Sequence, residues 1–134
     1  MYLLDTNVIS ELRRARTHGA VVAWIGAVAD HALHISAVSL SEIQRGIEIT
    51  RRQDPARAAE LEAWANQIGE GYEVVPMNGA VFRRWGRLMH GQSEVLSQDA
   101  MIAATALVHG LTVVTRNVRD FVPFGVPTVD PFAT

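Results

Sequence analysis

The chain has 134 residues, of which 12 are basic, 14 are acidic and 49% are hydrophobic, with five histidines and no cysteine. Without cysteine there can be no disulfide framework, zinc ribbon or cysteine nucleophile, and because every basic residue is an arginine, a Walker phosphate loop, a pyridoxal enzyme and a phosphoacceptor receiver domain lack the lysine they need. A net charge of −2 argues against coating of nucleic acid by bulk electrostatics and leaves a localised arginine face as the way to contact it.

Hydropathy gives no sign of a membrane span or a secretory leader. The longest apolar stretch, residues 20–29, ends at Asp30 and is far shorter than the roughly 18 residues that a membrane span requires. The N-terminus carries Asp5 and no basic segment, which does not fit a secretory signal. We therefore expect a cytoplasmic protein without membrane contact. A chain of this length can bury a self-sufficient core, so we expect one domain over residues 1–134.

Short apolar runs and helical periodicities alternate along the chain. The predicted strands are residues 2–4, 33–35, 73–75 and 111–114. A helix through Val8, Ile9 and Leu12 follows the first strand, and a second, apolar helix over about residues 21–28 fits either the core or a dimer surface. The next helix starts near Glu42 and is followed by one that begins at Pro55, with Asp54 as its cap, and ends by Gly71.

The last third of the chain continues the alternation. Val81, Trp85, Leu88 and Met89 form the apolar stripe of another helix. Residues 100–108 are apolar on every side and are closed by His109 and Gly110, which predicts a buried central helix. The tail over residues 123–131 contains three prolines and predicts a surface loop with a short edge strand. The whole pattern is typical of an α/β fold with a mostly parallel central sheet and helices on both faces.

Four carboxylates stand where such a fold gathers its loops. In an open α/β sheet ligands bind beyond the carboxyl ends of the strands. Asp5 directly follows the first strand, Glu42 follows the second by a few residues, Asp99 opens the buried helix, and Asp120 follows the last predicted strand. We therefore expect these side chains, the candidate catalytic residues, to converge.

Each carboxylate also has an ordinary structural interpretation. Asp5 or Thr6 could be only a helix N-cap, and Ser39 with Glu42 matches a capping box. Ser97 could cap the buried helix with Asp99 in its first turn. A charge heading a helix that is buried on all sides is expensive unless it is paired, however, which favours a functional role for Asp99.

The combination is more informative than any single residue. Asp120 alone would be a loop residue, in a turn begun by Asn117. Four converging carboxylates repel one another unless a divalent cation neutralises them, and hard oxygen ligands select magnesium or manganese. Such an ion can activate water for attack on a phosphate, so the sequence predicts phosphodiester hydrolysis.

Other chemistry-bearing residues receive a default interpretation. None of the five histidines has metal-ligand spacing, and the three tryptophans lie on apolar helical stripes, which favours packing in the core. Most arginine clusters are expected to be solvated helix faces. Arg116 and Arg119 differ, because they share a segment with Asn117 and Asp120 and could hold a substrate phosphate.

Four motifs together resemble the PIN-domain proteins, and more narrowly the VapC toxins of bacterial toxin–antitoxin pairs, including the FitB-like branch. They are Leu-Leu-Asp-Thr-Asn-Val-Ile-Ser (3–10), Ser-x-Ser-Glu-Ile-x-x-Gly (39–46), Asp-Ala-Met-Ile-Ala-Ala-Thr-Ala (99–106) and Thr-Arg-Asn-x-x-Asp-Phe (115–121). Their order and spacing match along nearly the whole chain. The resemblance implies a three-layer α/β/α domain, a magnesium-dependent endoribonuclease, a homodimer, and inhibition by a VapB-type antitoxin bound across the active site.

The matching motifs also imply roles for individual residues. Asp5 and Asp99 would ligate Mg²⁺ directly, with Mn²⁺ as a substitute, while Glu42 and Asp120 would complete the acidic cluster. Thr6, Thr115 and Asn117 would be supporting polar groups. Many relatives carry aspartate where this chain has Asn117, so we expect a single well-held ion.

We predict a toxin ribonuclease acting on RNA, and two rivals differ from it. The first is an interaction module that works inside an antitoxin complex gripping operator DNA, with weak or vestigial nuclease activity. The second is an aspartyl phosphatase of the haloacid dehalogenase type. That enzyme needs a second aspartate where this chain has Asn7, and a lysine that the chain lacks.

Overall fold

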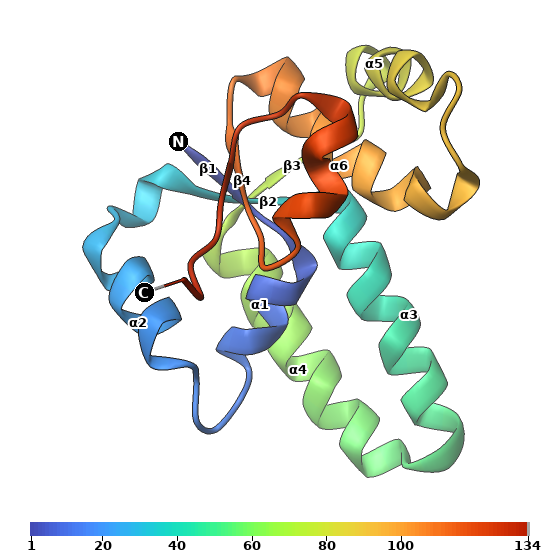
Figure 1. Cartoon of the computed structure of the whole chain (residues 1–134). Helices are drawn as coiled ribbons and strands as arrows, with labels where there is room; N and C mark the ends of the chain where they lie inside the picture. The colour runs from blue at the N-terminus through green and yellow to red at the C-terminus, as the bar shows by residue number, and fades with distance from the viewer. Residues whose placement is uncertain (134) are drawn as a thin grey trace.

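A five-stranded parallel sheet lies at the centre of the computed structural model, which describes residues 1–133 (Figure 1). The strand order is β3-β2-β1-β4-β5. Every neighbouring pair is parallel, and Leu3 of the central strand is in register with His34 on one side and Val113 on the other. The strands are β1 Tyr2–Leu4, β2 Leu33–Ser36, β3 Glu73–Val75, β4 Thr112–Val114 and β5 Thr128–Val129.

Six α-helices and three short 3₁₀ helices connect the strands within the described residues. The α-helices are α1 Thr6–Leu12, α2 Gly19–Ala27, α3 Ala37–Gln53, α4 Pro55–Gly71, α5 Gly79–Met89 and α6 Ser97–His109. The 3₁₀ helices are η1 Asp30–Ala32, η2 Glu94–Leu96 and η3 Val118–Phe124. The four predicted strands, the main helices and the short edge strand of the tail are confirmed, except that the helix expected to start near Glu42 begins at Ala37. The 3₁₀ helices had no signal in the periodicity.

Two hydrophobic cores cover the two faces of the sheet, because side chains alternate along each strand. Leu3 and Val113 face one core, where they pack with α6, with Phe121 of η3 and with the inner face of α5. Leu4 and Val114 face the other core, which contains residues of α1, α3 and α4. This arrangement is the three-layer α/β/α fold with a parallel central sheet that the sequence predicted, and α3 and α4 extend from it as a long hairpin (Figure 1).

The apolar helix whose role the sequence left open belongs in part to the core. Val21 of α2 is fully buried, and Trp24 packs edge-on against Tyr2 with 4.9 Å between the ring centroids. Val22, on the other face of α2, is 54% exposed. Within residues 1–133 no helix combines the length and the apolar character that crossing a bilayer demands.

Helix boundaries confirm some sequence signals and correct two. The Asp54 side chain accepts a hydrogen bond from the Arg57 backbone N–H at 3.0 Å, with Pro55 in the first position of α4, and Gly110 ends α6 with a φ of +67°. The expected capping box at Ser39 and Glu42 is wrong, because Ser36 caps α3 by accepting from the Val38 N–H at 3.1 Å.

The expected N-cap at Ser97 is also wrong. The 3₁₀ helix η2 runs directly into α6, so Ser97 is already the first residue of that helix and its side chain makes no capping bond. Its backbone oxygen instead accepts a hydrogen bond from the Trp85 indole N–H at 3.1 Å. Asp99 lies in the first turn of α6, as predicted.

Candidate active site

The order in which strands are added to the sheet changes direction between β1 and β4, and polar residues follow both of these strands. After β1 it adds β2 and β3 on one side; after α6 it returns to add β4 and β5 on the other. A switch point of this kind leaves a crevice at the carboxyl ends of the strands. Asp5 follows β1 and Thr115 follows β4, and the Asp5 backbone N–H donates to the Val114 carbonyl at 2.9 Å.

The Asp5 carboxylate is buried and held by three hydrogen bonds. Its Oδ1 accepts from the Thr6 backbone N–H at 2.8 Å, which makes Asp5 the N-cap of α1. Its Oδ2 accepts from the Thr115 hydroxyl at 2.8 Å and from the Asn7 side-chain amide at 3.2 Å. Capping of α1 therefore occupies one oxygen, and the other belongs to a network of side chains, so the two sequence interpretations of Asp5 are compatible.

Asn7 and Thr115 form the centre of that network. The Asn7 amide also donates to the Thr115 hydroxyl oxygen at 3.3 Å, and Asn7 Oδ1 accepts from the Arg116 backbone N–H at 3.2 Å. The Asn117 backbone N–H donates to the Thr115 hydroxyl oxygen at 3.0 Å. Asn117 thus contacts the site through its main chain.

Glu42 reaches the same site from one turn inside α3. The Thr6 hydroxyl is shared between Glu42 Oε1 at 3.1 Å and the hydroxyl of buried Ser39 at 2.9 Å. Because β2 runs into α3 with Ser36 as the cap, Ser39 and Glu42 lie three and six residues beyond that cap and face α1. The sequence allowed this pair to be a capping box as well as part of the acidic site; in the structure the two side chains connect α3 to Thr6 of α1.

Asp99 and Asp120 approach from the opposite side. The helix α6 leads into β4, so its first turn, which carries the half-buried Asp99, lies at the carboxyl edge of the sheet. Asp120 lies in the first turn of η3, exposed, and its neighbour Phe121 is fully buried against the α6 side of the core. Phe121 therefore fixes η3 and with it the backbone of Asp120.

Burial and mutual repulsion raise the pKa of three of the four carboxyls. Burial raises the pKa of Asp99 to about 6, helped by the charges of Asp5, Asp120 and Glu42. Burial also raises the pKa of Asp5, with a contribution from Asp120, while the bonds from Thr115, Thr6 and Asn7 lower it. For Glu42 burial and the Asp5 charge raise the pKa and the Thr6 hydroxyl lowers it. Asp99 thus lies within electrostatic range of the other three carboxylates.

The donor set fits a hard divalent cation. Among the ion pairs of residues 1–133, none involves any of the four clustered carboxylates, so their charges have no arginine to neutralise them. All the donors are oxygens, which magnesium and manganese prefer. In the part of the chain that is described, no three carboxylate or histidine side chains meet in metal-holding geometry. As the side chains lie, an ion at this site would take at most two carboxylates directly.

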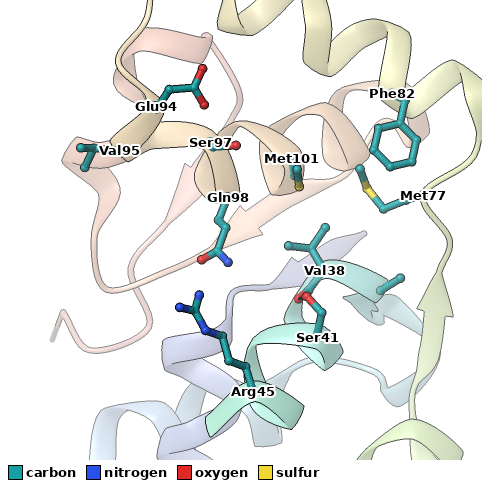
Figure 2. A pocket seen from close by; sticks show the side chains of 11 residues that line it. Val38, Ser41, Arg45, Met77, Phe82, Glu94, Val95, Ser97, Gln98 and Met101 are labelled. Atoms are coloured by element: carbon teal, nitrogen blue, oxygen red, sulfur yellow. Dashed lines mark hydrogen bonds between the residues drawn. The ribbon is translucent and has the colours of Figure 1, made fainter.

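A groove of about 640 Å³ opens beside the cluster, between α3 and the start of α6. Figure 2 shows Arg45 of α3 and Gln98 of α6 extending toward one another across it, and Met77 and Phe82 close one end. Gln98 directly precedes Asp99, but none of the four clustered carboxylates is among the residues that line the groove.

The buried histidine of the sheet and the three tryptophans lie outside the carboxylate cluster. His34, buried in β2, has Nδ1 3.2 Å from the Tyr2 carbonyl and Nε2 3.4 Å from Glu73 Oε2, away from the carboxylate cluster. Trp24, Trp64 and Trp85 are partly buried and pack on the two cores, which confirms their predicted role in packing. Arg116, on the segment after β4, and Arg119, in η3, are both exposed.

Sequence reasoning missed Asn7 and Ser39 as members of the site. Asn7 had a usable signal, because a polar residue two positions after Asp5, in the first turn of α1, projects from the same end of the sheet. For Ser39 the only signal was its place in the motif of residues 39–46, since its burial depends on where α3 begins.

This fold and this cluster of acidic residues at the switch point of the sheet define a PIN domain, and the chain belongs to that family: a model of the PIN domain matches residues 2–122. The chain is 34% identical to the VapC ribonuclease Y4jK of Sinorhizobium fredii and 32% identical to the toxin FitB of Neisseria gonorrhoeae, over 98% of this chain in both cases and 98% and 99% of the relatives. The crystal structure of FitAcB from Neisseria gonorrhoeae superposes with a TM-score of 0.87 at 29% identity, covering 100% of both chains. The predicted relationship to VapC and FitB-like proteins is confirmed.

Proposed function

We propose that this protein is the toxin of a type II toxin–antitoxin pair and acts as a magnesium-dependent endoribonuclease. The observation that carries the proposal is the gathering of Asp5, Glu42, Asp99 and Asp120 around one edge of the sheet without a cationic partner among the described residues. Relatives that match along nearly their whole length are named VapC ribonuclease and toxin FitB, which supports both the nuclease activity and the toxin role.

In the proposed mechanism Asp5 and Asp99 would hold Mg²⁺, or Mn²⁺ in its place, and Glu42 and Asp120 would complete the acidic cluster and help to orient water. When bound, the ion would polarise a phosphate oxygen of RNA and lower the pKa of a water that attacks phosphorus. The side chains around Asp5 favour the ionised form that a metal ligand needs. Burial raises the pKa of Asp5, and the bonds from the Thr115 hydroxyl and the Thr6 N–H partly offset that rise.

Thr6 has a corresponding task toward Glu42. Its hydroxyl lowers the pKa of Glu42 and fixes that carboxylate from the side of α1. The guanidinium groups of Arg116 and Arg119 belong to the segment that follows β4 at the same edge of the sheet and are available to pair with the substrate's phosphates.

The partners follow from the relatives. The FitAcB crystal structure, at 29% identity, supports a VapB- or FitA-like antitoxin as partner, and we place the protein in the cytoplasm as a homodimer that this antitoxin inhibits. A second function is favoured by one comparison: a structure of FitAB bound to a DNA fragment superposes with a TM-score of 0.86 at 28% identity. The protein would then also, or chiefly, serve in an operator-binding repressor complex.

Purified protein free of antitoxin separates the two functions. Incubation with total RNA and millimolar Mg²⁺ should yield chelator-sensitive cuts with a 5′-phosphate and a 3′-hydroxyl. Asp5→Asn should abolish them, and Glu60→Gln, on the exposed face of α4, should not. Intact RNA with the unaltered protein would exclude the ribonuclease and leave the repressor role, and full activity of Asp5→Asn would exclude the site.

A further inference from the structure

A second polar pocket lies on the flank of α1, next to the acidic cluster but made of different residues. Its volume is about 280 Å³. Three guanidinium groups line it against a single carboxylate, so it is cationic, whereas the cluster at the end of the sheet is anionic. The residues of this arginine pocket that matter here are Arg13, Arg14, Arg116, Glu11, Phe132 and Asn7.

Aromatic faces hold two of the three arginines. The guanidinium carbon of Arg116 lies 4.3 Å from the centroid of the Phe132 ring, and that of Arg13 lies 5.8 Å from the centroid of Trp64. Cation–π contact restrains a guanidinium without using its N–H donors, which point outward in the plane of the group. Arg13 and Arg116 are exposed, so both retain donors for a ligand.

A buried carboxylate contacts the third arginine, Arg14. Glu11 Oε1 lies 3.3 Å from a terminal nitrogen of Arg14, and only 5% of the Glu11 side chain is exposed. Within residues 1–133 the other carboxylate oxygen, Oε2, is buried without a hydrogen-bond partner. A buried charge is costly unless it is paired, so the ion pair with Glu11 restrains Arg14 at the pocket.

Asn7 connects the arginine pocket to the candidate active site. It lines the pocket, donates to Asp5 Oδ2 and accepts from the Arg116 backbone N–H. Ser10 and Arg13 border both this pocket and the cleft that contains Thr6 and Glu42. A strand whose scissile phosphate lay at Asp5 would therefore place a neighbouring phosphate beside the three arginines.

We propose that the arginine pocket binds a backbone phosphate of the RNA adjacent to the bond that is cut. The assignment rests on the proposed ribonuclease function. It adds Arg13 and Arg14 to the residues that bind the substrate, with Glu11 and Phe132 as the residues that position Arg14 and Arg116. Arginine is suited to bidentate contact with phosphate, and a cationic pocket beside an anionic cluster separates the binding of the backbone from the binding of metal. Glu11 is a positioning residue, since it acts through Arg14.

The test measures binding of a fluorescein-labelled short single-stranded RNA of mixed sequence by anisotropy, in EDTA so that nothing is cut, over a series of NaCl concentrations. Arg13→Ala with Arg116→Ala should weaken binding at least about tenfold near 100 mM NaCl and reduce the slope of log K against log salt by about 0.7 for each lost phosphate contact. The matched control, Arg57→Ala with Arg83→Ala on α4 and α5, should leave the affinity and the slope within about twofold of the unaltered protein.

Conservative variants separate positioning from simple charge. Arg116→Lys keeps the charge but loses the stacking on Phe132 and the bidentate geometry, so it should recover only part of the affinity. Glu11→Gln should lower the affinity for RNA by a few-fold and raise the KM for cleavage, while kcat stays nearly constant.

The outcomes distinguish the pocket from the activity. If the unaltered protein cuts RNA and the double arginine variant binds and cuts like it, the pocket assignment is overturned and the ribonuclease stands. If RNA is bound through the arginines but never cut, the ribonuclease proposal fails and the pocket remains a phosphate site. If the double variant instead loses binding of labelled poly-glutamate and keeps its affinity for RNA, the pocket serves an acidic protein partner and the assignment is wrong.

Discussion

The hydroxyl of Thr115 donates a hydrogen bond to Oδ2 of Asp5 at 2.8 Å, across 110 positions of the sequence. Both residues directly follow strands, β4 and β1, which are neighbours in the sheet. Thr115 has no exposed surface, so its hydroxyl must be satisfied inside the protein. The bond thus has two effects. It connects the segments that follow β1 and β4, and it favours the ionised form of Asp5.

Thr115→Val removes this bond and keeps the shape of the side chain. Since the bond lowers the pKa of Asp5, its loss should raise that pKa further, and the acid limb of the pH–activity profile should move to higher pH. The free energy of unfolding should fall by about 1–2 kcal/mol, because a buried carboxylate oxygen loses its shortest hydrogen bond. Urea unfolding and cleavage rates from mildly acidic to mildly alkaline pH would measure both effects.

Thr105→Val is the matched control for that change. Thr105 is fully buried in α6 and donates to the Met101 carbonyl at 2.8 Å, on the same helix as Asp99 but further from the cluster. It should affect stability without moving the acid limb. An equal shift of the profile in both variants would show that Thr115 acts only through stability.

The pKa of Asp99 gives a second prediction, for the protein without metal. The pKa of Asp99 in the folded chain is about 6 against an ordinary value of 3.8, so the folded state binds the proton more tightly than the unfolded state does. The contribution of Asp99 to stability is therefore greatest below about pH 4 and is lost as the pH rises through about 6. Because Asp99 is only half-buried, solvent screening limits the loss to about 1 kcal/mol.

Asp99→Asn should remove this pH dependence. In EDTA at mildly alkaline pH the variant should melt about 3 °C above the unaltered protein, since 1 kcal/mol corresponds to a few degrees in a domain of this size. Below about pH 4 the two should melt together. A variant that is less stable than the unaltered protein at mildly alkaline pH would mean that Asp99 is stabilised as an anion, contrary to the repulsion described above.

Metal addition and removal provide the third prediction. Since Mg²⁺ would relieve the repulsion among the carboxylates, it should stabilise the folded state, by about 2.7 kcal/mol at a concentration about one hundred times its Kd. The rise in Tm should be reversed by EDTA, should shrink below about pH 6 as Asp99 takes up a proton, and should be absent in Asp5→Asn with Asp99→Asn. A rise of equal size in that double variant would place the ion elsewhere.

Strand ends and helix starts made most of this site predictable from the sequence. Apolar runs followed at once by Asp5 and by Thr115 identify the carboxyl edge of a parallel sheet, and the all-apolar run after Asp99 identifies a buried helix that begins at that edge. The exact start of α3 could not be predicted, because Ser36 and Ser39 are equally good caps locally and only packing of α1 against α3 decides between them.

Contacts between distant segments account for the rest. The stacking of Arg116 on Phe132 depends on how the tail after β5 returns over α1, for which Pro127 and Pro131 give no more than a loop. Arg13 and Arg14 look like an ordinary solvated pair in sequence, and only the fold shows one on Trp64 and the other on buried Glu11.

Phe121 yields the fourth prediction, which connects the core with the site. Its side chain is fully buried and holds η3, whose first turn carries Asp120, against α6. Phe121→Ala should cost about 3–4 kcal/mol of stability, as large-to-small changes in cores do, while Phe121→Leu should cost about 1 kcal/mol. If η3 positions Asp120, Phe121→Leu should also reduce cleavage several-fold under conditions in which it is fully folded. Unchanged cleavage by folded Phe121→Leu would show that Asp120 does not need this anchor.

Asn117 gives the fifth prediction, on the number of ions that the proposed metal site takes, because its main chain joins the network around Asp5. Its backbone N–H is committed to the Thr115 hydroxyl, so a change of its side chain leaves that bond in place. Asn117→Asp would add a fifth negative charge beside the cluster. We expect one Mn²⁺ per chain in the unaltered protein and a second, weaker one in the variant, measured by titration calorimetry. Asn117→Ser, which is polar but uncharged, should keep a stoichiometry of one. Two equivalent ions in the unaltered protein would contradict the proposal of a single-ion site.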